Sequence, residues 1–70
     1  QEALMPTSQR CHRVLQELVT PAICGNFRQV RRRVLCDAWR RVAEENIPFR
    51  EAVRRSWDQA LDQCRGAGTE

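Results

Sequence analysis

The residues with the greatest chemical potential are four cysteines and one histidine. The cysteines stand at positions 11, 24, 36 and 64, and His12 follows the first of them. No two cysteines have the C-x-x-C spacing of a redox or zinc-knuckle motif, and one histidine adds little to a metal site. No serine, cysteine or aspartate has a base at a local spacing that would form a nucleophile pair. We therefore expect no metal, no cofactor and no enzymatic activity.

The even number of cysteines in so small a domain permits a disulfide framework. The alternative is four reduced thiols that behave as small apolar residues, as they often do in cytosolic proteins. The first alternative indicates a secreted protein or another oxidising compartment, whereas the second fits the cytoplasm or the nucleus.

A cluster of arginines at residues 28–33 is the second candidate for function. All twelve basic residues of the 70-residue chain are arginines, and the net charge is +3. Residues 1–35 carry six arginines and two acids, a balance of +4, whereas residues 36–70 carry six arginines and seven acids, a balance of −1. The excess positive charge therefore lies in the first half, where it favours an acidic partner.

The arginines of this cluster lack local acidic partners. Among Arg28, Arg31, Arg32 and Arg33, only Arg33 has an acid three or four residues away, namely Asp37. Cations in the first half of a helix also oppose the helix macrodipole, and such local conflicts concentrate at functional sites. A solvated surface without a partner is the alternative interpretation.

The partner-binding residues that we predict are Arg28, Arg31, Arg32 and Trp39. At helical spacing, Arg28 and Arg31 project on the same side as Trp39, whose ring could lie under an arginine or anchor a partner. For Trp39, as for Trp57, packing in the core is the alternative. In the second half, arginines and acids recur at helical spacing, as in Asp37 with Arg33 and Arg41, which favours solvated ion pairs on helix surfaces.

Three helices must position these residues. The apolar residues recur at spacings of three and four, which predicts helices near residues 8–20, 26–45 and 48–65. Pro21 and Pro48 separate them, Asn26 is a natural N-cap, and Asn46 suits a left-handed helix end. The middle segment has so wide an apolar arc that it needs neighbours on two sides. The sequence therefore predicts an all-α domain, an up-down-up three-helix bundle, over residues 8–65, with a lead-in at 1–7 and a tail at 66–70.

The same arrangement selects one disulfide pairing out of three. The first hairpin turns near residue 23, so antiparallel helices bring Cys11 level with Cys36. Cys64 then lies at the same end as Cys24. We therefore expect Cys11–Cys36 and Cys24–Cys64 if the cysteines are oxidised.

The function that these patterns favour is protein–protein interaction through helix faces, with an acidic surface on the partner. A small nucleic-acid-binding protein that uses the same arginines is the alternative. Mean hydropathy is −0.64, and no segment has the length and apolar character of a transmembrane span or a signal peptide. Self-association and the identity of the partner stay open.

Overall fold

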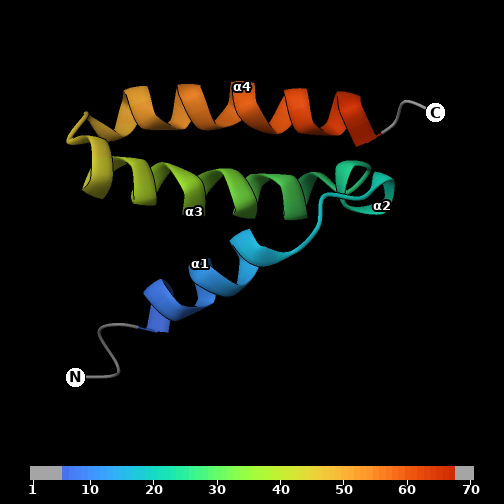
Figure 1. The fold of residues 1–70 in the computed structure, drawn as a ribbon, viewed down its shortest axis with the longest axis horizontal. Coiled ribbons are helices and arrows are strands. Elements are labelled where there is room, and N and C mark those ends of the chain that lie inside the picture. The colour runs from blue at the N-terminus through green and yellow to red at the C-terminus, as the bar shows by residue number, and fades with distance from the viewer. Residues whose placement is uncertain (1–5, 68–70) are drawn as a thin grey trace.

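The computed structural model describes residues 6–67 of the chain, and these residues fold into helices without any strand (Figure 1). The helices are α1 (Pro6–Gln16), α2 (Pro21–Cys24), α3 (Phe27–Glu45) and α4 (Phe49–Ala67). The predicted all-α class and the alternating chain direction of the three long helices are confirmed. The predicted lead-in and tail lie largely outside the described residues.

The first half departs from the prediction at two points. Helix α1 ends at Gln16 rather than near residue 20, and Leu18 is left 81% exposed. Pro21 does not simply end a helix but begins the one-turn helix α2, whose N-cap Thr20 accepts a hydrogen bond from the Ile23 amide at 3.3 Å. Proline is tolerated at the first position of a helix because its missing N–H would have no partner there.

Both ends of α3 follow the predicted capping residues. The Asn26 side chain accepts from the Gln29 amide at 3.3 Å at the start of α3. Asn46 closes α3 in the left-handed conformation, with φ of 56°, and its amide donates to the Val42 carbonyl. Asparagine reaches this conformation more easily than most residues that carry a Cβ. The reversal that follows places α4 antiparallel beside α3.

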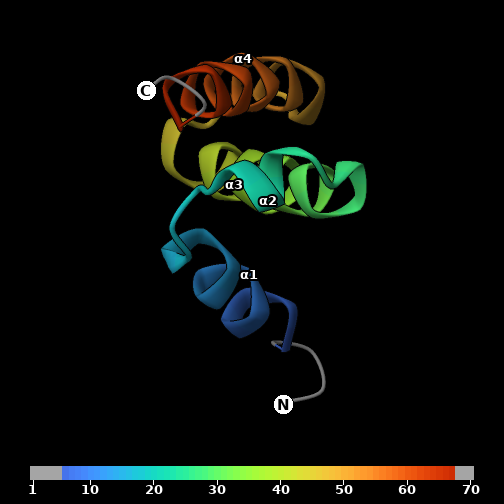
Figure 2. The ribbon, with the colours of Figure 1, turned by 90° about the vertical axis from the view of Figure 1, so that its right-hand side faces the viewer.

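Helix α3 is the middle layer of the molecule (Figure 2). Helix α4 packs along one side of it, and α1 crosses another side at an inclination, whereas α1 and α4 have no contact with each other among the described residues. The two-sided burial predicted for the middle segment is therefore confirmed. The bundle is less closed than expected, because the first and last helices do not meet.

Small side chains dominate the interior between α3 and α4. Val34, Ala38, Ala52 and Ser56 are at most 2% exposed, and Val53 and Trp57 pack at the edge of this core. Small residues allow two helix backbones to approach closely, which leaves the large rings at the periphery. The core alternative for Trp39 is therefore not realised, since 55% of that residue is exposed.

Two disulfides tie the layers together. Cys11–Cys36 joins α1 to α3, with 5.1 Å between the Cα atoms, and Cys24–Cys64 joins α2 to α4, with 5.6 Å. The predicted pairing is confirmed. Disulfides of this kind fit an oxidising compartment. None of the described helices has the length and hydropathy needed to cross a membrane.

Candidate partner-binding face

Helix α3 keeps one side that neither α1 nor α4 covers. At about 100° per residue, Arg28, Arg31, Arg32, Leu35 and Trp39 fall within a sector of about 100° of the helix. We call this surface the open face. Four of the five residues are exposed and Leu35 is half-buried. The open face is thus basic at the start of α3 and apolar toward its end.

The three arginines of the open face carry uncompensated charge. Arg28, Arg31 and Arg32 are exposed, and no carboxylate pairs with them among residues 6–67. The first turn of α3 also contains no acidic residue. The helix N-terminus already has positive character from its free N–H groups, so it adds to the local positive potential.

Arg33, the fourth arginine of the cluster, has a different role. Its guanidinium donates to the Val14 carbonyl at 2.8 Å and to the Leu15 carbonyl at 3.4 Å. These are carbonyls of the last turn of α1, where the regular helix ladder runs out, and the Val14 carbonyl also accepts from the Glu17 amide at 3.2 Å. The predicted Arg33–Asp37 ion pair is wrong, because Arg33 turns toward α1 and Asp37 binds other arginines.

Trp39 forms the apolar end of the open face. Its ring stacks on Phe49, with 4.3 Å between the ring centroids and 28° between the planes. The arginine predicted over this ring is absent among the described residues, and an aromatic ring takes its place. Phe49, from the first turn of α4, was not predicted as part of the site, although its position just after the Ile47-Pro48 break places it near the end of α3.

A second aromatic stack lies at the other end of the hairpin. Phe27 and Trp57 have ring centroids 6.1 Å apart, and Phe27 is 68% exposed.

Arg50 and Arg54 on α4 are exposed, and no carboxylate binds them among the described residues. Neither residue was predicted as a partner-binding residue, and for Arg54 an acid at helical spacing, Asp58, offered a local partner.

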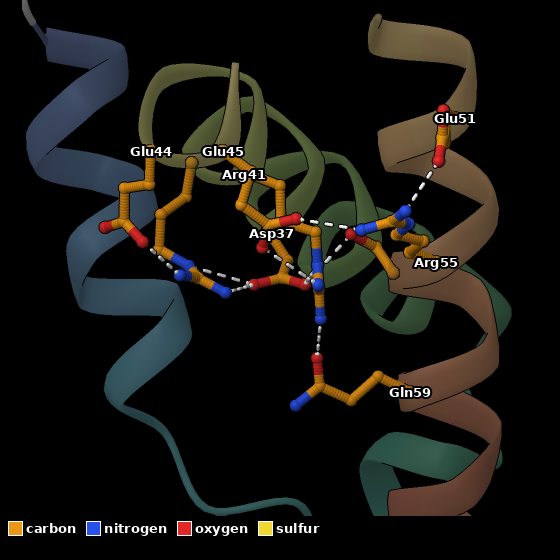
Figure 3. Close-up of polar contacts among 9 residues, drawn as sticks. Asp37, Arg41, Glu44, Glu45, Glu51, Arg55 and Gln59 are labelled. Carbon is orange, nitrogen blue, oxygen red and sulfur yellow. Dashed lines mark hydrogen bonds and ion pairs between the residues drawn. The ribbon is translucent and has the colours of Figure 1, made fainter. Parts of the chain in front are cut away.

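The acidic residues gather on the other side of α3, around Asp37 (Figure 3). Asp37 accepts from Arg40 Nε at 3.0 Å, from Arg41 Nε at 2.9 Å and from the Ser56 hydroxyl at 2.9 Å. Burial works to raise the pKa of Asp37, and the hydrogen bonds from Arg40, Arg41 and Ser56 outweigh it, so the pKa is lowered from 3.8. The arginines of α3 that form ion pairs therefore lie in this network, on the side of the helix away from the open face.

The network also bridges α3 and α4. Glu45 accepts from Arg55 at 3.1 Å, and Arg55 holds Glu51 at 2.6 Å. Arg41 donates to Gln59 across the same interface. The i,i+4 pairs predicted for Arg41 with Asp37, Arg40 with Glu44 and Arg55 with Glu51 are confirmed. The pair of Arg54 with Asp58 is not formed within the described part of the chain.

Among the described residues, no three histidine, cysteine or acidic residues are grouped so that they could bind a metal ion. All four cysteines are in disulfides. Comparison of the chain with family models, with curated proteins and with solved structures finds no match. The geometry of this chain therefore carries the functional argument alone.

Proposed function

We propose that this protein is a small, disulfide-stabilised interaction module that binds another protein through the open face of α3. Arg28, Arg31 and Arg32 attract an acidic surface of the partner, and Trp39 provides the apolar anchor. The observation that carries the proposal is the coincidence, on one side of α3, of a half-exposed tryptophan and three exposed arginines that pair with no carboxylate among the described residues.

Stability does not account for this arrangement. Arg28, Arg31 and Arg32 repel one another, and they lie in the half of α3 where the macrodipole disfavours cations. Later in the same helix the arginines are paired with acids, as Arg40 is with Asp37 and Glu44 and Arg41 is with Asp37 and Glu45. Because these three arginines do not stabilise the fold, a role in binding a partner explains their presence better.

Trp39 has the properties of an interface anchor. Tryptophan and arginine are the residues most often found at the energetic centre of protein interfaces. Stacking on Phe49 holds the ring in one orientation, so that little side-chain entropy is lost when a partner covers it. The two disulfides keep the surrounding backbone in place, and they favour a secreted protein or another oxidising compartment.

Removal of the three cations tests the proposal. The variant Arg28→Gln, Arg31→Gln, Arg32→Gln should melt at the same temperature as the wild type or slightly higher, because like-charge repulsion is relieved. Its affinity for an acidic amphipathic helical peptide should fall, and the remaining affinity should depend less on salt. The matched control is Arg10→Gln, Arg13→Gln, Arg54→Gln, which removes the same charge from other exposed positions.

The same titrations separate protein binding from nucleic-acid binding. Duplex DNA or RNA as the true ligand would bind more tightly than the peptide, with affinity falling by about one logarithmic unit per tenfold salt for each phosphate neutralised. That result, or equal loss of peptide binding in both triple variants, would contradict the assignment to the open face. A lower melting temperature with unchanged peptide binding would make the three arginines structural.

A further inference from the structure

A polar cleft lies between α1 and α4, on the opposite side of α3 from the open face. Because the two outer helices do not touch, they leave a cavity of about 310 Å³ with α3 as its floor. His12 and Gln16 line it from α1, and Gln59 and Gln63 line it from α4. At about 100° per residue, Asp37 on the floor is half a turn away from Arg28.

The charges of the cleft leave a positive balance. Two arginines, Arg33 and Arg40, line the cleft together with one acid, Asp37, a balance of +1, and Asp37 itself binds Arg40, Arg41 and Ser56. Arg33 also lines the cleft, and its partners are two neutral carbonyls rather than a carboxylate. The charge of its guanidinium therefore has no counter-ion among residues 6–67.

Hydrogen-bond donors without partners surround this charge. No hydrogen bond or ion pair joins the side chains of His12, Gln16 and Gln63 to another described residue. Their side chains supply N–H groups from both walls of the cleft. Apolar contact is also available, since Leu15 from α1 and Val34 and Ala60 from α3 and α4 belong to the same lining.

We propose that this cleft binds a small carboxylic acid. The carboxylate of the ligand forms an ion pair with the Arg33 guanidinium and accepts hydrogen bonds from the side chains of Gln16, Gln63 and His12. The carbon skeleton of the ligand packs against Leu15, Val34 and Ala60. A carboxylate is the group that a guanidinium and several N–H donors recognise best. The cavity volume corresponds to the lower end of small-molecule sites, about 300–1,000 Å³. The site is independent of the partner proposed for the open face.

Helix α1 supplies one wall, and its attachment to α3 is therefore part of the site. Cys11–Cys36, the buried Val14 and the bonds from Arg33 hold α1 in place. Removal of this disulfide alone, in Cys11→Ala, Cys36→Ala, should release this wall and abolish binding in the cleft. Binding on the open face of α3, which uses no residue of α1, should persist.

The test is an NMR titration of the oxidised, ¹⁵N-labelled full chain with phenylacetate, with neutral phenylacetamide as the ligand control. We expect saturable shifts of the side-chain amides of Gln16 and Gln63 and of the Val34 backbone amide with the acid alone. N-acetylglycylphenylalanine tests whether the carboxylate comes from a peptide end rather than from a free acid: tighter binding than phenylacetate favours the peptide. Equal shifts with phenylacetamide, or no saturation with any of the three probes, would overturn the proposal.

Two variants locate the site. Arg33→Gln should weaken phenylacetate binding by about ten-fold or more, because it removes the charge-assisted bond. The matched control Arg54→Gln, at an exposed position of α4 outside the cleft lining, should bind as the wild type does. Since Arg33 also holds α1, Gln63→Leu on α4 provides a second variant that leaves this attachment intact. Wild-type affinity in Gln63→Leu would overturn the assignment whatever Arg33→Gln does.

Discussion

Asp37 is the residue on which the packing of α3 against α4 most depends. Its side chain is 15% exposed, and it holds two guanidinium groups and the hydroxyl of the almost fully buried Ser56. A buried hydroxyl without a partner would cost free energy, so the Asp37–Ser56 bond makes this serine acceptable in an otherwise apolar core. The carboxylate thus acts as a structural link between α3 and α4.

The lowered pKa of Asp37 gives the link a defined pH dependence. In the unfolded chain the carboxyl group titrates near 3.8, and in the folded protein it keeps its charge to lower pH. The unfolded state therefore binds the proton first as the solution is acidified, and stability falls as pH falls. The contribution of Asp37 is fully present above pH 3.8 and is lost as pH drops through the folded-state pKa.

We expect Asp37→Asn to lower the free energy of unfolding at neutral pH by about 1–3 kcal/mol, because four hydrogen bonds lose their charged acceptor. Between neutral pH and the acid range the variant should lose less stability than the wild type. Urea unfolding followed by circular dichroism at a series of pH values measures both effects. Asp58→Asn is the control, since Asp58 is exposed and pairs with no described residue. Identical acid sensitivity of Asp37→Asn and wild type would contradict this role.

Local spacing predicted many ion pairs but could not decide between competing partners. Arg33 and Arg41 are both four residues from Asp37, and the sequence treats them alike. The structure distinguishes them because Arg33 faces the end of α1, where it donates to the Val14 and Leu15 carbonyls, whereas Arg41 faces α4. The choice depends on tertiary neighbours, which the spacing of residues within one helix does not contain.

At the scale of elements, α1 is the most weakly attached of the three long helices. It contacts α3 alone, Val14 is its buried apolar residue among those described, and the segment from Glu17 to Thr20 has no helical structure. Helices α3 and α4, by contrast, share a long interface and a bridging polar network. Segments with few buried contacts open more readily than the rest of a protein.

Removal of Cys11–Cys36 should therefore detach α1 and leave the α3–α4 hairpin folded. In Cys11→Ala, Cys36→Ala we expect the amides of α1 to lose protection against hydrogen exchange while those of α3 and α4 keep it. The chain-entropy model assigns about 3–4 kcal/mol to a bridge that spans 25 residues. Hydrogen exchange by NMR measures the effect residue by residue.

The comparison variant is Cys24→Ala, Cys64→Ala, which opens the other bridge. It should lower protection at α2 and at the C-terminal half of α4 instead, because Cys24–Cys64 joins these segments. Equal loss of protection across α1, α3 and α4 in the Cys11 variant would show that the molecule unfolds as one unit. That result would contradict the weak attachment of α1.

The sequence predicted the helix ends well where a residue type favours a single structural role. Asn26 and Asn46 marked the ends of α3, and the cysteine levels followed from antiparallel helices of known rise. Pro21 misled, because proline breaks a helix in its interior and yet begins one at its first position. The contact of Arg33 with the last turn of α1 was also hidden, since Arg33 lies nineteen residues from Val14.

At the scale of the whole molecule, the two sides of α3 divide the polar residues between structure and binding. The side around Asp37 is rich in ion pairs that join the helices, and the open face has arginines without carboxylate partners and two stacked rings. The sequence placed Arg28, Arg31, Arg32 and Trp39 on one side of a helix. It could not show that this side stays uncovered, because that depends on where α1 and α4 dock.

The central claim is that the open face binds an acidic partner with Trp39 as its anchor. The most direct measurement is an NMR titration of the oxidised protein with a helical peptide that has glutamates at one end and leucines along one side. We predict contiguous shifts at Arg28, Arg31, Arg32 and Leu35 and at the Trp39 indole N–H. Trp39→Ala should weaken binding by about 30-fold or more, equivalent to about 2 kcal/mol. The exposed Leu61→Ala is the matched control and should bind normally. Shifts confined to other surfaces, or equal affinity of Trp39→Ala and wild type, would contradict the claim.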